Sequence, residues 1–249
     1  MSRRIVRAGY RLRRRRFVLR RLDRGSGGDV VRIGDTVRRP MPARAEFVND
    51  VLRHFARYDW PGAPRYLGAD EQGRQILTYL EGYVPRGLAQ PPAIWADRSL
   101  VRIAKLVRQF HDLTAGTRLA GDDEVVCHNA LSPATTVYRD DGAGLVPYAF
   151  IDWDRAAPGK RVHDVAHICW RFLDLGPRRT NPVGAAGLVR MLADSYGLAN
   201  RDRRVLVDAI LWCLQRALYG STRPDADVKQ AYDWVAAHRA TLDAALRPE

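Results

Sequence analysis

The chain has 249 residues, of which 46% are hydrophobic, and a formal net charge of +13. This apolar share suffices for a packed core and excludes disorder of the whole chain, while no uncharged apolar run reaches the roughly 18–20 residues of a membrane span. The three cysteines, Cys127, Cys169 and Cys213, form no C-x-x-C pair, which argues against a disulfide framework or a zinc site. We expect a soluble, cytoplasmic protein with reduced thiols.

The positive charge is concentrated at the N-terminus. Residues 1–24 contain eleven arginines and one acidic residue, Asp23, so they carry +10 and leave only +3 for the remaining 225 residues. Like charges such as those of Arg13 to Arg16 repel one another and resist compaction, so we expect residues 1–16 to form a basic arm. This arm could contact nucleic acid or an anionic membrane, although no DNA-binding motif accompanies it and a non-functional extension is the simpler interpretation.

Short strands around one helix are predicted for residues 17–82. A glycine-bearing turn at 25–28 separates the first two strands, and Gly34-Asp35 is a hairpin signal between the second and third. Phe47, Val51 and Phe55 recur at four-residue spacing and predict a helix over 44–57. We expect the strands at 17–19, 30–33, 36–39, 66–68 and 75–80.

After Gly82 the pattern becomes mainly helical, so Leu80-Glu81-Gly82 is a candidate hinge. Apolar residues from Leu100 to Phe110 predict a helix that ends near Asp112. Short apolar segments at 136–138 and 149–151 follow, and further helices are predicted at 162–174, 184–196, 202–217 and 227–246. The expected fold class is α+β, with a small β-rich N-lobe at 17–82 and a larger helical C-lobe at 83–249.

The segment with the most chemical information is the loop at 127–136 together with Asp152, which lies 17 positions after Thr135. Two short strands bring this loop and the aspartate to one place. A carboxylate at the end of a strand is a natural Mg²⁺ ligand, since that ion takes few protein carboxylates. For Asp152 alone, however, a turn or capping role is the simpler interpretation.

Taken together, these segments resemble the aminoglycoside phosphotransferase family, which is related to choline and homoserine kinases and has a two-lobed, protein-kinase-like fold. The resemblance begins near Gly27 and extends over most of the chain. It rests on the order and spacing of VVRIGDTVRRP (30–40), GAPRYLG (62–68), YLEG (79–82), QFHDL (109–113), CHNALSP (127–133), FIDWDRAAPG (150–159) and HDVAHICWRF (163–172).

The resemblance implies ATP and Mg²⁺ as cofactors and a small hydroxylated substrate. Asp152 then corresponds to the aspartate that chelates Mg²⁺. Arg38 is the best candidate for the cation of the third strand that steadies the phosphates, with its neighbour Arg39 as an alternative, and Glu46 is a possible partner for Arg38. Backbone N–H groups around Gly27 and Gly28 could cradle the phosphates, although a plain hairpin turn is the simpler interpretation of this pair.

The catalytic loop departs from the family pattern His-(Gly/Asn)-Asp-x-x-x-x-Asn. With His128 as the loop-organising histidine, Ala130 stands at the catalytic aspartate and Thr135 at the metal-binding asparagine. Alanine cannot accept a proton, and general-base catalysis typically contributes about 10²–10⁴-fold. Thr135 is at most a weak metal ligand through its hydroxyl.

Other residues near this loop could compensate only in part. Asn129 and Ser132 could orient a hydroxyl group, but neither is a base near neutral pH. Asp154 follows Asp152 by two positions, so on an extended segment it points to the same side and could be a second, weak metal ligand. Asp164 matches a family aspartate that braces the catalytic loop.

Most other histidines and aromatic residues have a structural interpretation. His111, His163 and His167 are expected to satisfy hydrogen bonds in the core or at helix ends. Trp153 is expected to pack beneath the metal-site strand, and Cys127 to be a buried, inert thiol.

Three hypotheses follow for the function. The first is a degenerate phosphotransferase-like protein with weak or no ATP-dependent transfer, which Ala130 and Thr135 favour. The second is an active ATP- and Mg²⁺-dependent small-molecule phosphotransferase, which the length of the resemblance favours. The third assigns the function to the basic arm, as a binder of nucleic acid or an anionic membrane.

Overall fold

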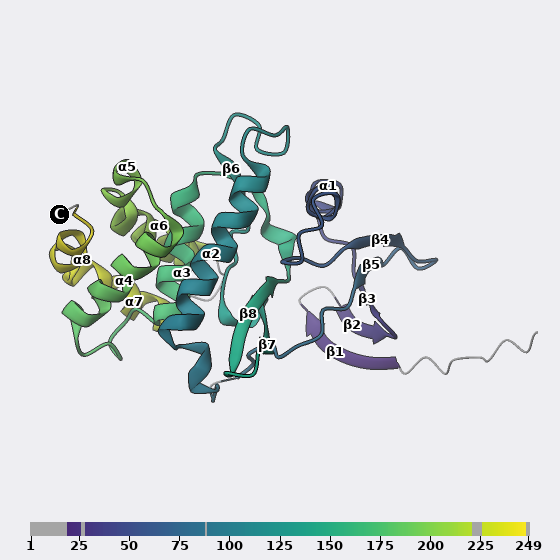
Figure 1. Cartoon of the computed structure of the whole chain (residues 1–249), viewed down its shortest axis with the longest axis horizontal. Helices are drawn as coiled ribbons and strands as arrows, with labels where there is room; N and C mark the ends of the chain where they lie inside the picture. The colour runs from purple at the N-terminus through teal and green to yellow at the C-terminus, as the bar shows by residue number, and fades with distance from the viewer. Residues whose placement is uncertain (1–18, 26–27, 88, 221–225, 248–249) are drawn as a thin grey trace, which may run out of the picture.

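The computed structural model describes the chain except for residues 1–18, 26–27, 88, 221–225 and 248–249. A sheet of five strands forms one end of the described chain, and helices form the other (Figure 1). The predicted α+β class is therefore confirmed. The basic arm at 1–16 lies outside the described residues, and the division of the chain into lobes at Gly82 stays a prediction.

The five-stranded sheet has the order β1-β2-β3-β5-β4, and every neighbouring pair is antiparallel. Gly25 pairs with Gly28 at the first turn, and Ile33 with Thr36 at the second, as the two glycine-containing signals predict. Burial alternates along the fifth strand, because successive side chains point to opposite faces. The strands are β1 (Leu19–Gly25), β2 (Gly28–Ile33), β3 (Thr36–Arg39), β4 (Tyr66–Ala69) and β5 (Gln75–Thr78).

Strand β1 is longer than the pattern predicted, and it lies further along the chain. The prediction placed a strand at 17–19, of which the first two residues lie outside the described chain. In the structure Leu19 pairs with Ile33, and pairing continues with one irregularity to Gly25. Part of the arginine-rich N-terminal sequence is therefore a strand of the sheet, because pairing with β2 satisfies its backbone groups.

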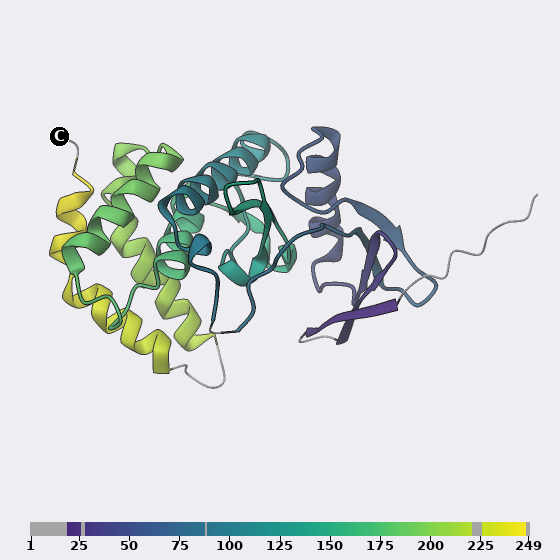
Figure 2. The same cartoon turned by 60° about the horizontal axis from the view of Figure 1, so that its bottom comes forward.

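Helix α1 (Ala45–Arg57) joins the sheet to the helical part of the chain (Figure 2). The ring of Phe55, on this helix, lies 5.0 Å from the ring of Trp153. Just after the helix, Trp60 donates a hydrogen bond to Gln109 Oε1 at 3.1 Å. Phe150 N donates to Gly62 O at 2.8 Å. These contacts fix α1 against the C-terminal part of the chain and so position the sheet over the candidate site.

The C-terminal part is built around α2 (Asp97–Thr114) and α3 (Arg161–Leu173), both of which bury apolar residues on one face. Two predicted long helices are each divided in the structure, since the helix breaks at 204–205 and again at His238. After the second break, Leu242 is buried in the core. The remaining helices are α4 (Pro182–Tyr196), α5 (Asn200–Arg203), α6 (Leu206–Tyr219), α7 (Ala226–Ala237) and α8 (Arg239–Ala245).

None of the helices in the described part of the chain has both the length and the apolar character needed to cross a bilayer.

Two small two-stranded sheets lie between α2 and α3 in the chain, and the loops that they hold form the candidate site. The short strand β6 (Val125–Cys127) pairs with β9 (Ala157–Gly159), and β7 (Thr136–Asp140) pairs with β8 (Leu145–Phe150). The segments between these strands, 128–135 and 151–156, therefore lie side by side.

The predicted strand at 75–80 ends earlier, at Thr78, and the chain then turns toward β7. Tyr83 exchanges two backbone hydrogen bonds of 2.8 Å with Tyr138. Gly82 makes this approach possible, because it has φ +154° and a Cβ there would lie 2.4 Å from Tyr138 O. The proposed hinge thus runs directly onto the hairpin that carries the site.

Candidate functional site

The loop that follows β6 has a distinctive backbone. Asn129 has φ +60°, a left-handed conformation that asparagine tolerates better than most residues. Its side-chain amide donates to Arg155 O at 3.2 Å and to Cys127 O at 3.4 Å. The amide is therefore engaged in holding the loop against the 151–156 segment.

Asp164 is the buried anchor of this loop. Its two carboxylate oxygens accept the backbone N–H groups of His128 at 2.7 Å and Asn129 at 2.9 Å, and the residue has no exposed surface. Burial by itself would raise the pKa of Asp164, but the hydrogen bond from His111 and the nearby imidazoles outweigh burial and lower the pKa to about 2. A permanently charged acceptor thus fixes the turn of the loop.

A chain of side-chain hydrogen bonds supports this anchor. His111 Nε2 donates to Asp164 at 3.1 Å, so its Nδ1 accepts from the Tyr196 hydroxyl at 2.7 Å. Tyr196 in turn accepts from Arg161 at 3.1 Å. Burial lowers the pKa of His111, which is therefore the neutral donor that this arrangement requires.

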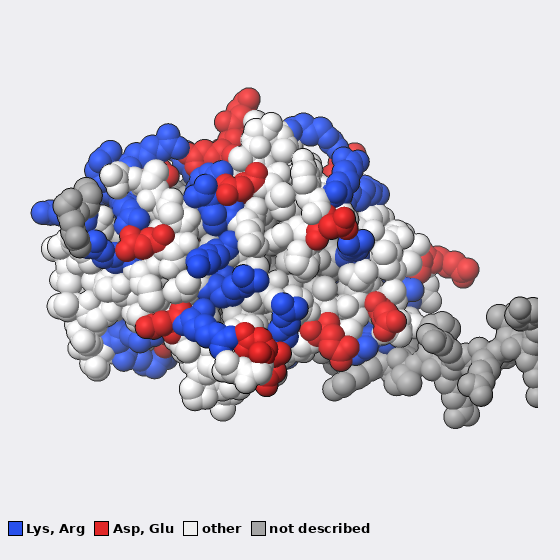
Figure 3. Space-filling view, in the orientation of Figure 1, with Lys and Arg blue, Asp and Glu red and all other residues white. Residues whose placement is uncertain are grey.

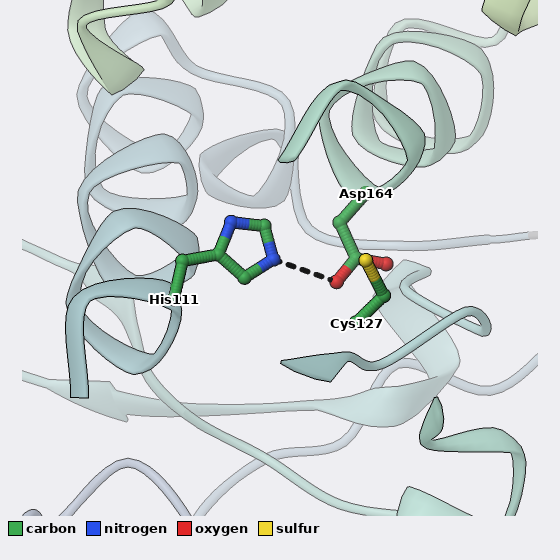
Figure 4. A group of neighbouring side chains, drawn as sticks. All are labelled: His111, Cys127 and Asp164. Carbon is green, nitrogen blue, oxygen red and sulfur yellow. Dashed lines mark hydrogen bonds and ion pairs between the residues drawn. The ribbon is translucent and has the colours of Figure 1, made fainter. Parts of the chain in front are cut away.

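His111, Cys127 and Asp164 come together below the loop, with possible metal-ligating atoms within 4.8 Å of one another (Figure 4). Their ligating atoms are already engaged, since His111 is hydrogen-bonded to Tyr196 and Asp164, and Cys127 Sγ donates to Lys160 O at 3.2 Å. Burial raises the pKa of the Cys127 thiol, which opposes the thiolate that a metal needs. The cluster is a brace for the loop.

At the position that the resemblance assigns to the catalytic aspartate, Ala130 contributes only its backbone. Its carbonyl oxygen accepts from the Thr135 hydroxyl at 3.0 Å, and the same hydroxyl accepts from Ser132 N at 3.0 Å. Thr135 Oγ1 therefore closes the loop on itself. The hydroxyl group of Ser132 also lies 3.4 Å from the Thr135 hydroxyl.

Asp152 and Asp154 both meet the side chain of Arg39. The guanidinium Nη1 lies 3.5 Å from Asp152 Oδ1, and Nη2 donates to Asp154 Oδ1. Asp152 has φ +64°, which turns the chain sharply after β8. Burial raises the pKa of Asp154, and the charge of Arg39 opposes that shift.

The arginine that faces these two aspartates is Arg39, and Arg38 lies on the opposite face of β3. Arg38 donates to Thr36 at 2.6 Å and pairs with Asp70 at 3.8 Å. The reason is strand alternation: Val37 packs on the core, so Arg39 shares its face and Arg38 does not. In the sequence, Val37 is the apolar residue of this strand, and its expected place in the core could have indicated that Arg39, two positions later, lies on the side of the site.

The expected pair of Arg38 with Glu46 is not formed between these described residues, and Glu46 is exposed on α1. Instead, β3 is joined to α1 through the neutral side-chain amides of Gln75 and Asn49. Gln75 accepts from Arg39 Nε at 2.6 Å and donates to Asn49 Oδ1 at 2.5 Å. Gln75 and Asn49 were not among the predicted site residues, because Gln75 meets Arg39 through the register of β3 with β5, and Asn49 meets Gln75 through the packing of α1.

The phosphate cradle at the first turn is described only in part. Gly28 begins β2 and pairs with Gly25, as in a plain hairpin, while Gly27 lies outside the described residues.

The residues present do not fit a magnesium ion of the expected kind. Mg²⁺ takes oxygen ligands in near-octahedral geometry. Ala130 supplies no side-chain oxygen, the Thr135 hydroxyl is engaged within its loop, and Asp152 and Asp154 are already paired with Arg39.

The histidines near the site predict a loss of stability in acid. Burial lowers the pKa of His111 and His128, and that of His167 to about 4. In the unfolded chain these imidazoles titrate near pH 6.5, so the unfolded state binds more protons below that pH, down to about pH 4 for His167. We expect the free energy of unfolding to fall over this range, by up to about 1.4 kcal/mol per pH unit and histidine.

This effect can be measured as the urea midpoint at pH 7.5 and pH 5.0. The variant His167→Gln removes one of these imidazoles and should show a smaller pH dependence than the unmodified chain. A midpoint that does not change between the two pH values would contradict the prediction.

Basic and acidic side chains are interspersed on the face shown in Figure 3. Helix α2 exposes four basic side chains, those of Arg98, Arg102, Lys105 and Arg108. Two of these four are paired, Arg98 with Asp141 and Arg108 with Asp112.

Comparison with curated proteins gives a relative along nearly the whole chain. The trifolitoxin immunity protein of Rhizobium leguminosarum bv. trifolii is 26% identical over 260 residues, which cover 89% of this chain and 96% of that protein. No protein-family model matches the chain.

Solved structures with the same fold are kinases and phosphotransferases. A choline/ethanolamine kinase family protein from Mesorhizobium loti has a TM-score of 0.57 at 16% identity, with 92% of both chains covered. Aminoglycoside phosphotransferase APH(3'')-Id from Streptomyces rimosus has a TM-score of 0.57 at 17% identity, and the match covers 86% of this chain and 92% of that chain. Aminoglycoside 2'-phosphotransferase-IIIa, in its GDP complex, has a TM-score of 0.54 at 14% identity, and the match covers 92% of both chains. The predicted protein-kinase-like phosphotransferase fold is confirmed.

Proposed function

We propose that this protein is a degenerate member of the aminoglycoside phosphotransferase family that binds a nucleotide or a related small molecule without transferring a phosphoryl group. The observation that carries the proposal is the loop around Ala130. The position of the base has no side-chain oxygen, and the neighbouring polar groups of Asn129, Ser132 and Thr135 are engaged in holding the loop.

The loop nevertheless keeps the architecture that a binding site requires. Asp164 fixes its backbone through two hydrogen bonds, and Asp152 and Arg39 from the two parts of the chain meet beside it. Phosphoryl transfer depends on positioning, metal-borne charge and a base. Here the positioning groups are present, while Ala130 stands at the position of the base and Thr135 at that of the metal-binding asparagine.

The test of lost transfer is ADP formation from ATP and Mg²⁺ by the full chain, in the presence of small hydroxylated acceptors. We expect a rate indistinguishable from that of the buffer. The variant Asp152→Asn identifies any contaminating kinase, because a rate that survives this change does not originate at the site. A rate well above the buffer that is lost in Asp152→Asn would establish the active phosphotransferase instead.

The test of binding is thermal unfolding with and without millimolar ATP, ADP or GTP. A ligand that binds only the folded state stabilises it by about 2.7 kcal/mol at one hundred times its Kd. An unchanged midpoint with all three nucleotides would refute the nucleotide as the ligand.

A second candidate function is protection against a toxin, which the alignment with the immunity protein favours because it covers almost the full length of both chains. Binding of the toxin at the same site would suffice for this role, with no phosphoryl transfer. Expression of the chain in a trifolitoxin-sensitive strain should raise the tolerated toxin concentration. Equal sensitivity with and without the chain, at verified expression, would remove this candidate.

The hypothesis that the basic arm binds nucleic acid or an anionic membrane stays a prediction, since the arm lies outside the described residues. Binding to DNA or anionic vesicles that disappears on deletion of residues 1–16 would support it.

A further inference from the structure

We infer that Arg39 takes the place of a divalent cation at Asp152 and Asp154, so that this site functions without a metal ion. The inference deepens the function proposed above, and rests on it for the role of the site as a binding site. The placement of Arg39 itself depends only on contacts of the described residues.

The guanidinium of Arg39 lies where the two carboxylates converge. It is 3.5 Å from Asp152 and hydrogen-bonded to Asp154, and its side chain is only 12% exposed, against 56% and 43% for the two aspartates. Arg39 belongs to β3 of the sheet, whereas both aspartates follow β8. One largely enclosed cation therefore lies against two carboxylates from the other part of the chain.

A second set of contacts holds this guanidinium in place. Its Nε donates to Gln75 Oε1 at 2.6 Å, and the buried Gln75 donates to Asn49 of α1 at 2.5 Å. In protein kinases an ion pair between a lysine and a glutamate of the corresponding helix steadies the phosphate-binding cation. Here two neutral amides fix the arginine, which leaves its full positive charge directed at Asp152 and Asp154.

Arg39 and a metal ion would compete for the same oxygens. A divalent cation bound by Asp152 and Asp154 would stand next to the guanidinium, and like charges at such a distance repel strongly outside bulk water. The metal would also lack further ligands, because Ala130 has no side-chain oxygen and Thr135 is engaged. Arg39, already tethered by Gln75, is therefore the favoured counter-ion.

The experiment uses Mn²⁺ as a spectroscopic substitute for Mg²⁺, with binding to the full chain followed by electron paramagnetic resonance in the absence of nucleotide. Arg39→Met removes the charge and retains most of the side-chain length. Arg38→Met is the matched control, since it removes the neighbouring arginine, which pairs with Asp70 on the other face of β3.

We expect the unmodified chain and Arg38→Met to show no saturable Mn²⁺ binding below about 1 mM, a concentration that corresponds to only about −4.1 kcal/mol of binding free energy. Arg39→Met should bind one Mn²⁺ at least about tenfold more tightly, or about 1.4 kcal/mol. The further change Asp152→Asn in that variant should abolish this gain.

Saturable Mn²⁺ binding by the unmodified chain that is lost in Asp152→Asn would overturn the inference. The same holds if Arg39→Met folds, as its circular dichroism would show, but binds Mn²⁺ no better than Arg38→Met. If Arg39→Met does not fold, Mn²⁺ binding by the unmodified chain, compared with that by Asp152→Asn, still decides whether the site takes a metal ion. Because nucleotide is absent, these results are independent of the ADP-formation test, which can refute the proposed function while leaving the role of Arg39 intact.

Discussion

Replacement of Asp164 by alanine is expected to lower the free energy of unfolding by about 3–5 kcal/mol at pH 7. The carboxylate accepts three hydrogen bonds in a fully buried place, from His128 N, Asn129 N and His111 Nε2. Alanine would leave three donors without partners, and each unsatisfied buried group costs about 1–3 kcal/mol. Urea unfolding at equilibrium measures the difference.

The matched control for this change is Asp233→Ala, which makes the same substitution at an exposed residue paired with Lys229. Its expected cost is within about 0.5 kcal/mol. Asp164→Asn retains the shape and one acceptor oxygen, so it should lie between the two. Equal stabilities of Asp164→Ala and Asp233→Ala would show that Asp164 does not anchor the loop.

Replacement of Trp153 by alanine is the second large effect, with an expected loss of about 3–5 kcal/mol for a buried aromatic residue. The Trp153 ring is 1% exposed, and lies 5.0 Å from Phe55 of α1, 5.1 Å from Phe110 of α2 and 4.6 Å from His128. Its Nε1 also donates to Phe150 O at 3.0 Å. Urea unfolding measures the loss as a lower midpoint with an unchanged slope.

Tyr219→Ala is the control for Trp153→Ala, since Tyr219 is 84% exposed and its loss should change the stability by no more than about 0.5 kcal/mol. Trp153 stands between Asp152 and Asp154, so its loss should also loosen both carboxylates around Arg39. A folded Trp153→Ala variant with the stability of the unmodified chain would contradict the packing described above.

These two residues support the site from opposite sides. Asp164 fixes the backbone at His128 and Asn129, and Trp153 fixes the segment of Asp152 against α1 and α2. Neither substitution removes a group that would contact a ligand. Their expected effects are therefore on the positioning of the site, through the stability of the chain.

Much of the site could be predicted from the sequence because it consists of short continuous motifs. The loop after Cys127, the aspartate after Ile151 and the brace at Asp164 follow from the order of these motifs, and the structure brings all three together. The choice between Arg38 and Arg39 could not be made in this way. It depends on which face of β3 is buried, and the two arginines are adjacent in the chain.

Thr135 illustrates the same limit. As a residue type it could contribute a weak metal ligand, and only the folded loop shows that its hydroxyl bridges Ser132 N and Ala130 O. A hydroxyl group is available to a ligand only if the fold leaves it without closer partners.

The sequence alone determines the +13 charge, the α+β class and the alanine at position 130, since each depends on composition, local periodicity or the identity of one residue. The tertiary structure decided how much of the arginine-rich N-terminus belongs to the sheet, which arginine meets Asp152 and Asp154, and where the Thr135 hydroxyl is directed. The physical reason is that hydrogen bonds and ion pairs join groups that are distant in the chain. Strand register and burial determine which of them meet.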